Sequence, residues 1–151
     1  MEILAQEGTP WVYPERYNFN DNIIELRDRR GFGPSEQIIV DLFINGKEVS
    51  ILNGKERYHY VFGGPIILTD KYIYIPLFET RDNEHKTKNP TFWDHLTAFT
   101  GYYISRVSYS GDIEILSKKF GMVYLVKIKD NTLYFKTGKE GSIKSIEISS
   151  E

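Results

Sequence analysis

Three histidines are the side chains best suited in this chain to bind a metal ion or to transfer protons near neutral pH. His85 and His95 are ten residues apart, whereas compact zinc sites space neighbouring ligands by about two to five residues. His95 directly follows Asp94, and adjacent residues of a helix point in different directions. His59 is remote from both in sequence. The histidine pattern therefore predicts neither a metal site nor a bound cofactor.

Paired carboxylates are the second group that could do chemistry. Glu79, Asp82 and Glu84 could supply a general acid and a general base. However, Asp82 and Glu84 belong to, and Glu79 directly precedes, a polar stretch, residues 80–89, that is typical of an exposed loop. Carboxylates in such a loop keep ordinary pKa values. The sequence contains no phosphate-binding glycine motif and no Gly-x-Ser-x-Gly motif, and Ser110-Gly111 indicates a hairpin turn. We therefore predict that the chain is not an enzyme.

The charge balance argues against a nucleic-acid partner. The chain has 19 lysines and arginines against 21 aspartates and glutamates, a net charge of −2, and binding to nucleic acid calls for a basic face. Arg27, Arg29 and Arg30 beside Phe32 could clamp phosphate and stack a base. Nearby carboxylates such as Glu25 are the partners that we expect for these arginines instead.

Length and composition indicate one cytoplasmic domain over residues 1–151. A chain of 151 residues without cysteine has the length of a single domain and forms no disulfide. Residues 1–7 lack the basic and apolar regions of a secretory signal. Apolar runs such as Ile73–Phe78 are far shorter than the roughly 20 residues that span a membrane.

Regularly spaced turn signals predict the elements that carry these side chains. Gly101, Gly111 and Gly121 recur every ten residues, Asn45-Gly46 is a strong hairpin signal, and β-forming residues fill the intervals. The pattern predicts an all-β fold, an antiparallel meander of about ten strands. The strands are expected over Asn22–Leu26, Gln37–Ile44, Lys47–Leu52, Arg57–Phe62, Pro65–Leu68, Tyr72–Phe78, Tyr102–Tyr109, Asp112–Leu116, Met122–Ile128, Thr132–Thr137 and Ile143–Ser149.

Two stretches depart from the meander. The first twenty residues are expected to be irregular, because Pro10 and Pro14 disfavour a central strand. Residues 90–99 are expected to form one short helix, with Asn89 as its cap and apolar residues at three- and four-residue spacing. The meander could form a two-sheet sandwich, a half-propeller or a partly open barrel.

The segment from Glu79 to Phe99 combines exposed charges with large aromatic rings, the residue types that anchor protein interfaces. It is the predicted partner-binding site, and replacing Trp93 by alanine is expected to weaken partner binding by about 2 kcal/mol without unfolding the protein. Alternatively, these rings close one open end of the sheets. A second candidate surface is Trp11–Tyr17. The predicted partner-binding residues are Glu79, Arg81, Asp82, Glu84, Phe92, Trp93, Asp94 and His95.

Two predicted hairpins carry a family resemblance. Thr69–Phe78 and Val126–Phe135 resemble hairpins of half-propeller immunity folds, and the small, cysteine-free, tyrosine-rich chain resembles bacterial immunity proteins of contact-dependent inhibition and polymorphic toxin systems. The resemblance implies a cytoplasmic bacterial protein that neutralises a toxin domain, such as a nuclease, by covering its active site. The acidic members of the predicted site, Glu79, Asp82, Glu84 and Asp94, would then mimic phosphate.

The sequence is also compatible with two other functions. One is a small-molecule-binding β-barrel, or an enzyme built on such a barrel, in which Tyr58, Tyr60, Tyr72 and Tyr74 would converge on a cavity. The other is a structural subunit that assembles through its sheet edges. Two packed sheets without an enclosed cavity would favour the protein-binding module.

Overall fold

A computed structural model describes residues 2–6, 16–31, 38–49, 58–81, 99–138 and 141–149, with the backbone alone for 28–31, 38–39, 58–61, 79–81 and 99–100. These residues form thirteen strands and no helix. The strands are β1 (Glu2–Leu4), β2 (Arg16–Phe19), β3 (Asn22–Gly31), β4 (Ile38–Ile44), β5 (Lys47–Val49), β6 (Tyr58–Phe62), β7 (Ile67–Leu68), β8 (Tyr72–Arg81), β9 (Phe99–Ser108), β10 (Ile113–Ile115), β11 (Tyr124–Lys129), β12 (Thr132–Lys136) and β13 (Lys144–Glu147).

The strands form two antiparallel sheets. One has four strands in the order β1-β11-β12-β13; the other has nine, running β10-β9-β8-β6-β4-β3-β2, with β5 paired to β4 and β7 to β8. Within the larger sheet, a single residue pair, Val40 with Phe62, joins β4 to β6. The larger sheet therefore consists of two parts, β2–β5 and β6–β10.

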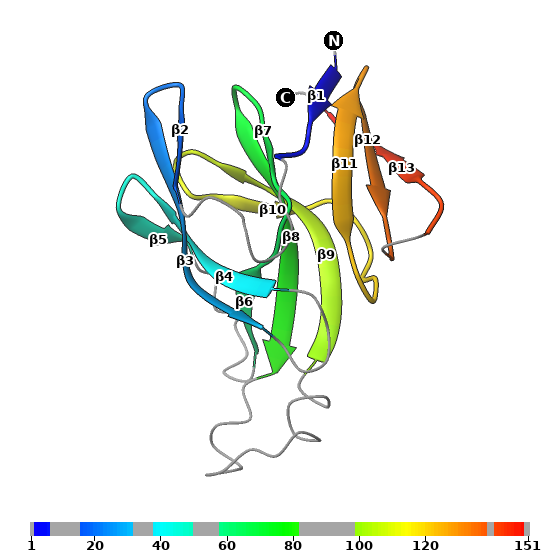
Figure 1. The fold of residues 1–151 in the computed structure, drawn as a ribbon, viewed down its shortest axis with the longest axis horizontal. Coiled ribbons are helices and arrows are strands. Elements are labelled where there is room, and N and C mark those ends of the chain that lie inside the picture. The colour runs from blue at the N-terminus through cyan, green and yellow to red at the C-terminus, as the bar shows by residue number, and fades with distance from the viewer. Residues whose placement is uncertain are drawn as a thin grey trace.

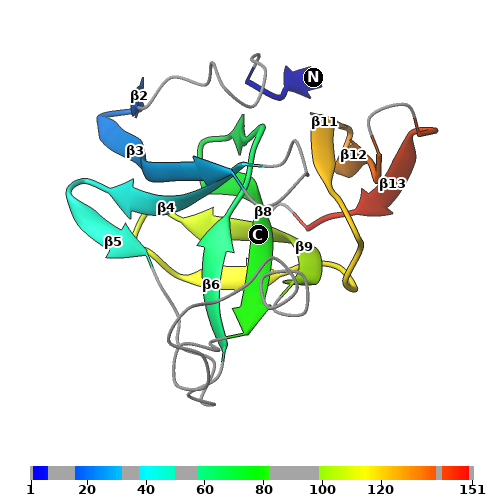
Figure 2. The same cartoon turned by 60° about the horizontal axis from the view of Figure 1, so that its bottom comes forward.

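These three groups of strands stack as three layers. In Figure 1, β2–β5 form a first layer on the left, β8 and β9 lie in a middle layer, and β11–β13 form a third layer on the right. Figure 2 shows the same separation after rotation, with β3–β5 and β11–β13 on opposite sides of β8. The β8–β9 hairpin is thus covered on both faces.

Successive side chains of β8 are buried in two different hydrophobic cores, one on each face of the sheet. Ile73, Ile75 and Leu77 are fully buried against the first layer. Tyr74 and Phe78 point to the other face and are buried against the third layer. Successive strand residues face opposite sides, so a strand buried on both faces needs a continuous apolar run rather than an alternating one.

The structure confirms the predicted all-β, antiparallel class and corrects the number of strands. Thirteen strands form where about ten were expected, and β1 and β2 lie within the stretch that was expected to be irregular. Most strands pair with a sequence neighbour, as in a meander, but β1 pairs with β11, so that Ile3 lies opposite Ile128. Local turn signals do not show such a distant pairing.

The structure also differs from the sequence expectation at Phe99, within the expected helix, and at Gly101, an expected turn. Phe99, the last residue of the expected helix, lies in β9, and residues 90–98 lie outside the described residues. Gly101 lies inside β9 rather than in a turn, with a φ of 115°. A Cβ atom there would lie 2.9 Å from the carbonyl oxygen of Phe120. Close backbone approach, rather than chain reversal, therefore requires this glycine.

Candidate functional site

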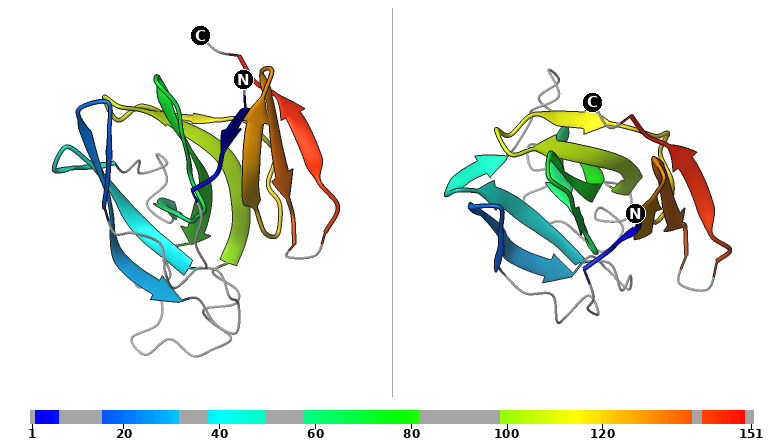
Figure 3. Two further views of the ribbon diagram at one scale, coloured as in Figure 1. Left: turned by 45° about the horizontal axis from the view of Figure 1, so that its top comes forward. Right: turned by 90° about the horizontal axis from the view of Figure 1, so that it is seen from above.

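Four hairpin turns gather at one end of the molecule, which we call the turn face. They are Asn20–Asp21 between β2 and β3, Asn45–Gly46 between β4 and β5, Thr69–Lys71 between β7 and β8, and Tyr109–Asp112 between β9 and β10. Lys47 and Glu48, which begin β5 directly after its turn, are counted with this face. Figure 1 and the left view of Figure 3 place all four toward the same upper-left end. They come from both the first and the middle layers, so the stacking of these layers brings them together.

Local sequence specifies two of these turns directly. Asn45 and Gly46 have φ values of 51° and 83°, and Asn20 and Asp21 have φ values of 48° and 64°. Two consecutive positive φ angles characterise the type I′ turn, whose twist matches that of the flanking strands. Asparagine, aspartate and glycine tolerate this conformation better than other residues. The prediction of a hairpin at Asn45-Gly46 is confirmed.

Side-chain hydrogen bonds fasten the turns to one another. The Asn20 amide donates to the Asp70 carboxylate at 2.9 Å, which joins the β2–β3 turn to the β7–β8 turn. The Tyr109 hydroxyl donates to the carbonyl oxygen of Thr69 at 2.7 Å, which joins the β9–β10 turn to the β7–β8 turn. Three of the four turns are therefore linked directly, and the Asn20–Asp70 bond connects the first layer to the middle layer.

The remaining turn is fixed to its own layer by Asn45. Its side-chain oxygen accepts a hydrogen bond from the backbone N–H of Ile23 at 2.8 Å, and its side-chain nitrogen donates to the Asn22 side-chain oxygen at 3.0 Å. Both bonds are to the start of β3, directly after the β2–β3 turn. The backbone of Asn45 thus adopts the positive φ that the turn requires, and its side chain holds the β4–β5 hairpin against β3.

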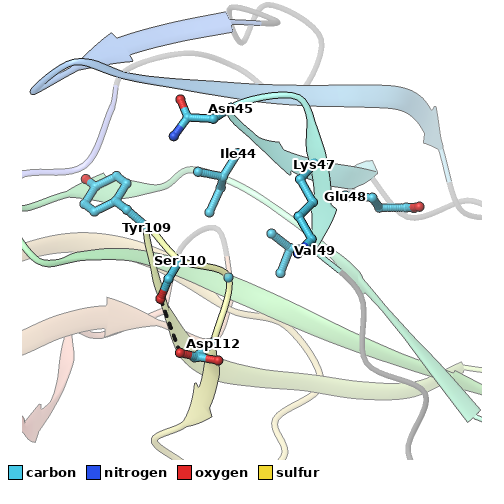
Figure 4. A pocket seen from close by; sticks show the side chains of 9 residues that line it. Ile44, Asn45, Lys47, Glu48, Val49, Tyr109, Ser110 and Asp112 are labelled. Atoms are coloured by element: carbon cyan, nitrogen blue, oxygen red, sulfur yellow. Dashed lines mark hydrogen bonds between the residues drawn. The ribbon is translucent and has the colours of Figure 1, made fainter.

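A groove of about 460 Å³ separates the β4–β5 hairpin from the β9–β10 turn. Ile44 and Val49 are buried and supply apolar surface, whereas Ser110 and Asp112 are exposed and polar. Figure 4 shows Lys47 extending from one hairpin toward the other and Glu48 turned aside. The lining residues are Ile44, Asn45, Lys47, Glu48, Val49, Tyr109, Ser110, Gly111 and Asp112.

The β9–β10 turn has its own hydrogen-bond network. The Ser108 and Ser110 hydroxyl oxygens lie 2.9 Å apart, and Ser110 donates to the Asp112 carboxylate at 3.3 Å. The backbone N–H of Asp112 donates to the Ser108 hydroxyl at 3.1 Å. The prediction that Ser110-Gly111 forms a hairpin turn is confirmed, and the network holds this wall of the groove in shape.

The pH dependence of stability tests the position of Tyr109 in this arrangement. Burial, and secondarily the charge of Asp70, raise the pKa of its phenol to about 12 from the ordinary value of 10.0. Because the folded pKa is higher than the unfolded one, the neutral phenol stabilises the fold below pH 10, and this contribution is lost as the pH rises toward 12. We expect unfolding free energy to fall more steeply over this window in the native chain than in Tyr109→Phe, as measured by urea unfolding at several pH values. Equal slopes would contradict the buried phenol.

The predicted partner-binding residues lie elsewhere. Glu79 and Arg81 belong to the last residues of β8, where their backbones pair with Tyr60 and Tyr58. This end of β8 is opposite to the end that starts at the β7–β8 turn. The other predicted residues, Asp82, Glu84, Phe92, Trp93, Asp94 and His95, lie outside the described residues, as do residues 11–15 of the second candidate surface.

The structure describes the side chains of two of the four tyrosines that were expected to converge on a cavity. Tyr74 is 3% exposed and packs in the core between the middle and third layers. Tyr72 and Tyr74 also line a pocket of about 280 Å³, together with Ile3, Ile128 and Ile148. This volume is smaller than the roughly 300–1,000 Å³ of common small-molecule sites. The side chains of Tyr58 and Tyr60 are not among those described.

Within the described ranges, no three histidine, aspartate or glutamate residues group as metal ligands. No helix in this part of the chain is long and apolar enough to cross a membrane. Comparison of the chain with protein-family models, with curated proteins and with solved structures finds no match. The turn face therefore has to be interpreted from its own geometry.

Proposed function

We propose that the protein is a non-catalytic protein-binding module that contacts its partner through the turn face. The observation that carries the proposal is the set of side-chain hydrogen bonds that fixes the turns on the two sides of one groove, together with the Asn20–Asp70 bond that joins the two layers. Ordering loops on binding costs free energy, so loops already fixed by a scaffold bind with a smaller entropic loss. Binding residues commonly lie on loops held by a rigid scaffold.

The charges of the turn face favour a basic partner. Asp21, Glu48, Asp70 and Asp112 contribute four carboxylates, against the two ammonium groups of Lys47 and Lys71, and all six residues are exposed. Opposite charge across an interface mainly accelerates association. The resemblance to bacterial immunity proteins makes a toxin domain with a basic cleft, such as a nuclease, the partner to test first. The proposed setting is the bacterial cytoplasm.

The product of the gene adjacent to the one for this chain is the first candidate toxin, and co-expression with it tests the proposal. We expect the chain to restore growth of cells that produce the toxin and to co-elute with the purified toxin domain as a complex. The absence of both rescue and complex would contradict the assignment to immunity. A chain that turns over a substrate in pure form would contradict a non-catalytic role.

A charge reversal on the turn face tests the location of the interface. We expect Glu48→Lys to weaken binding of the toxin domain by about tenfold, since it replaces an attractive charge by a repulsive one. Glu147→Lys makes the same change on exposed β13 of the third layer, and should leave affinity within about a factor of two. Titration calorimetry measures both values.

The predicted site around Trp93 is tested in the same measurement. If Trp93→Ala abolishes binding while Glu48→Lys leaves it unchanged, the segment from Glu79 to His95 is the interface and the turn face is not. If both variants weaken binding, the partner contacts the turn face as well as the segment that contains Trp93. Circular dichroism of each variant verifies that it is folded.

A further inference from the structure

A buried arginine with a full set of hydrogen-bond acceptors connects the middle layer to the end of the third layer. Arg106 of β9 is 3% exposed. Its Nε and Nη2 atoms donate to the Glu114 carboxylate at 3.0 to 3.2 Å. Its Nη1 atom donates to the Tyr74 hydroxyl at 3.4 Å and to the carbonyl oxygen of Ser149. All three nitrogens of the guanidinium group are therefore engaged.

The residues around Arg106 hold its guanidinium group in place. The guanidinium carbon lies 4.2 Å from the ring centre of Tyr72, a cation–π contact. Glu114 belongs to β10, a three-residue strand at the edge of the nine-stranded sheet, and its side chain is 54% exposed. The buried charge is thus neutralised by a carboxylate that water can reach. Loss of that carboxylate would leave the arginine charge buried without this partner.

The segment that Arg106 holds, residues 144–149, packs lightly. It contains β13, which is the edge strand of its sheet and pairs with β12 alone. Ile146 and Ile148 are its partly buried side chains, and the rest of the segment is exposed. The N–H of Ile148 donates to the carbonyl oxygen of Asn131 at 2.9 Å. Segments with few buried apolar contacts open at low free-energy cost.

We propose that residues 144–149 form a strap that opens as a unit, and that Arg106 and Glu114 form its latch. Opening removes Ile148 from the wall of the pocket of about 280 Å³ that Tyr72 and Ile128 also line. It also frees the edge of β12, which pairs with β13 in the closed form. A free edge accepts an extended strand. The replacing strand would need apolar residues two positions apart, as Ile146 and Ile148 are.

Thiol labelling measures the opening of the strap, because the chain has no cysteine of its own. Ile148→Cys places a thiol in the strap, and Leu133→Cys places one in β12, at a residue with 0% exposure. Ile148 is only partly buried and Leu133 is fully buried, so we expect the strap thiol to react with a disulfide reagent at least about 100-fold faster than the core thiol. The change of the strap rate when the latch is removed then separates opening from direct access. We also expect low urea concentrations to leave the faster rate unchanged, since a local opening exposes little surface.

The latch is tested by Glu114→Gln in the Ile148→Cys chain. We expect labelling of the strap thiol to accelerate by about tenfold or more, as for loss of a charge-assisted hydrogen bond. Glu25→Gln is the matched control, since Glu25 pairs at 2.8 Å with Arg27 on the first layer, and it should leave the rate unchanged. Equal labelling of the two thiols would overturn the strap. An unchanged rate in Glu114→Gln would overturn the latch.

Discussion

Replacing Phe78 by alanine is expected to lower the free energy of unfolding by about 3–5 kcal/mol. Phe78 is fully buried between the middle and third layers. Its ring centre lies 5.0 Å from that of Tyr102 at an interplanar angle of 55°, a geometry that stabilises aromatic pairs beyond the burial of their surface. The substitution removes both contributions and leaves a cavity that neighbouring strands of the hairpin cannot fill.

Urea unfolding followed by tryptophan or tyrosine fluorescence measures this loss. Ile143→Ala is the control, because Ile143 is 54% exposed and its truncation should change stability by no more than about 0.5 kcal/mol. A loss below about 1 kcal/mol for Phe78→Ala would mean that the two layers are not packed on this ring.

Replacing Arg106 by alanine is the second change with a large expected effect, a loss of about 3 kcal/mol, which is at the lower end for breaking a buried ion pair. The lower end applies because Glu114 is 54% exposed and returns to water. The Tyr74 hydroxyl and the Ser149 carbonyl oxygen lose the donor that they share. The substitution also removes the cation–π contact between the guanidinium group and the Tyr72 ring.

Arg106→Lys separates the contribution of the positive charge to stability from that of the planar guanidinium group. Lysine keeps the positive charge but lacks the planar fork that reaches Glu114, Tyr74 and Ser149 together. We expect it to recover only part of the loss, and urea unfolding of the two variants gives the comparison. Arg27→Ala provides a surface reference, since the Arg27 side chain is 46% exposed in its pair with Glu25 and exposed pairs contribute about 0–1 kcal/mol. An equally small loss in Arg106→Ala would show that its buried contacts do not stabilise the fold.

The sequence predicts the features that depend on neighbouring residues. The apolar run Ile73–Phe78 is expected as a strand and lies in β8, and Asn45-Gly46 forms the expected hairpin turn. Val40, Leu42 and Ile44, which alternate along the expected strand Gln37–Ile44, share one buried face, as their period-two spacing predicts. In each case a few consecutive residues determine both the backbone conformation and the buried side.

Features that depend on distant residues were missed. Nothing local marks Glu2–Leu4 as a strand, since its partner is β11. Each turn of the turn face has a local signal, of which the one at Asn20–Asp21 was missed, but the Asn20–Asp70 bond joins residues fifty positions apart. Arg106 lies in a predicted strand, and only the stacking of layers buries it. An Asn-Asp pair between Phe19 and Ile23 could have indicated the first turn.

The distant pairing of β1 has a consequence for how the chain assembles during synthesis. Glu2 and Lys127, which form an ion pair at 3.0 Å, are 125 residues apart, and a ribosome adds roughly 5–20 residues per second. β1 must therefore wait several seconds after its synthesis until β11 exists. The earliest-made strand of the four-stranded sheet finds its partner only after β2 to β10 have been made.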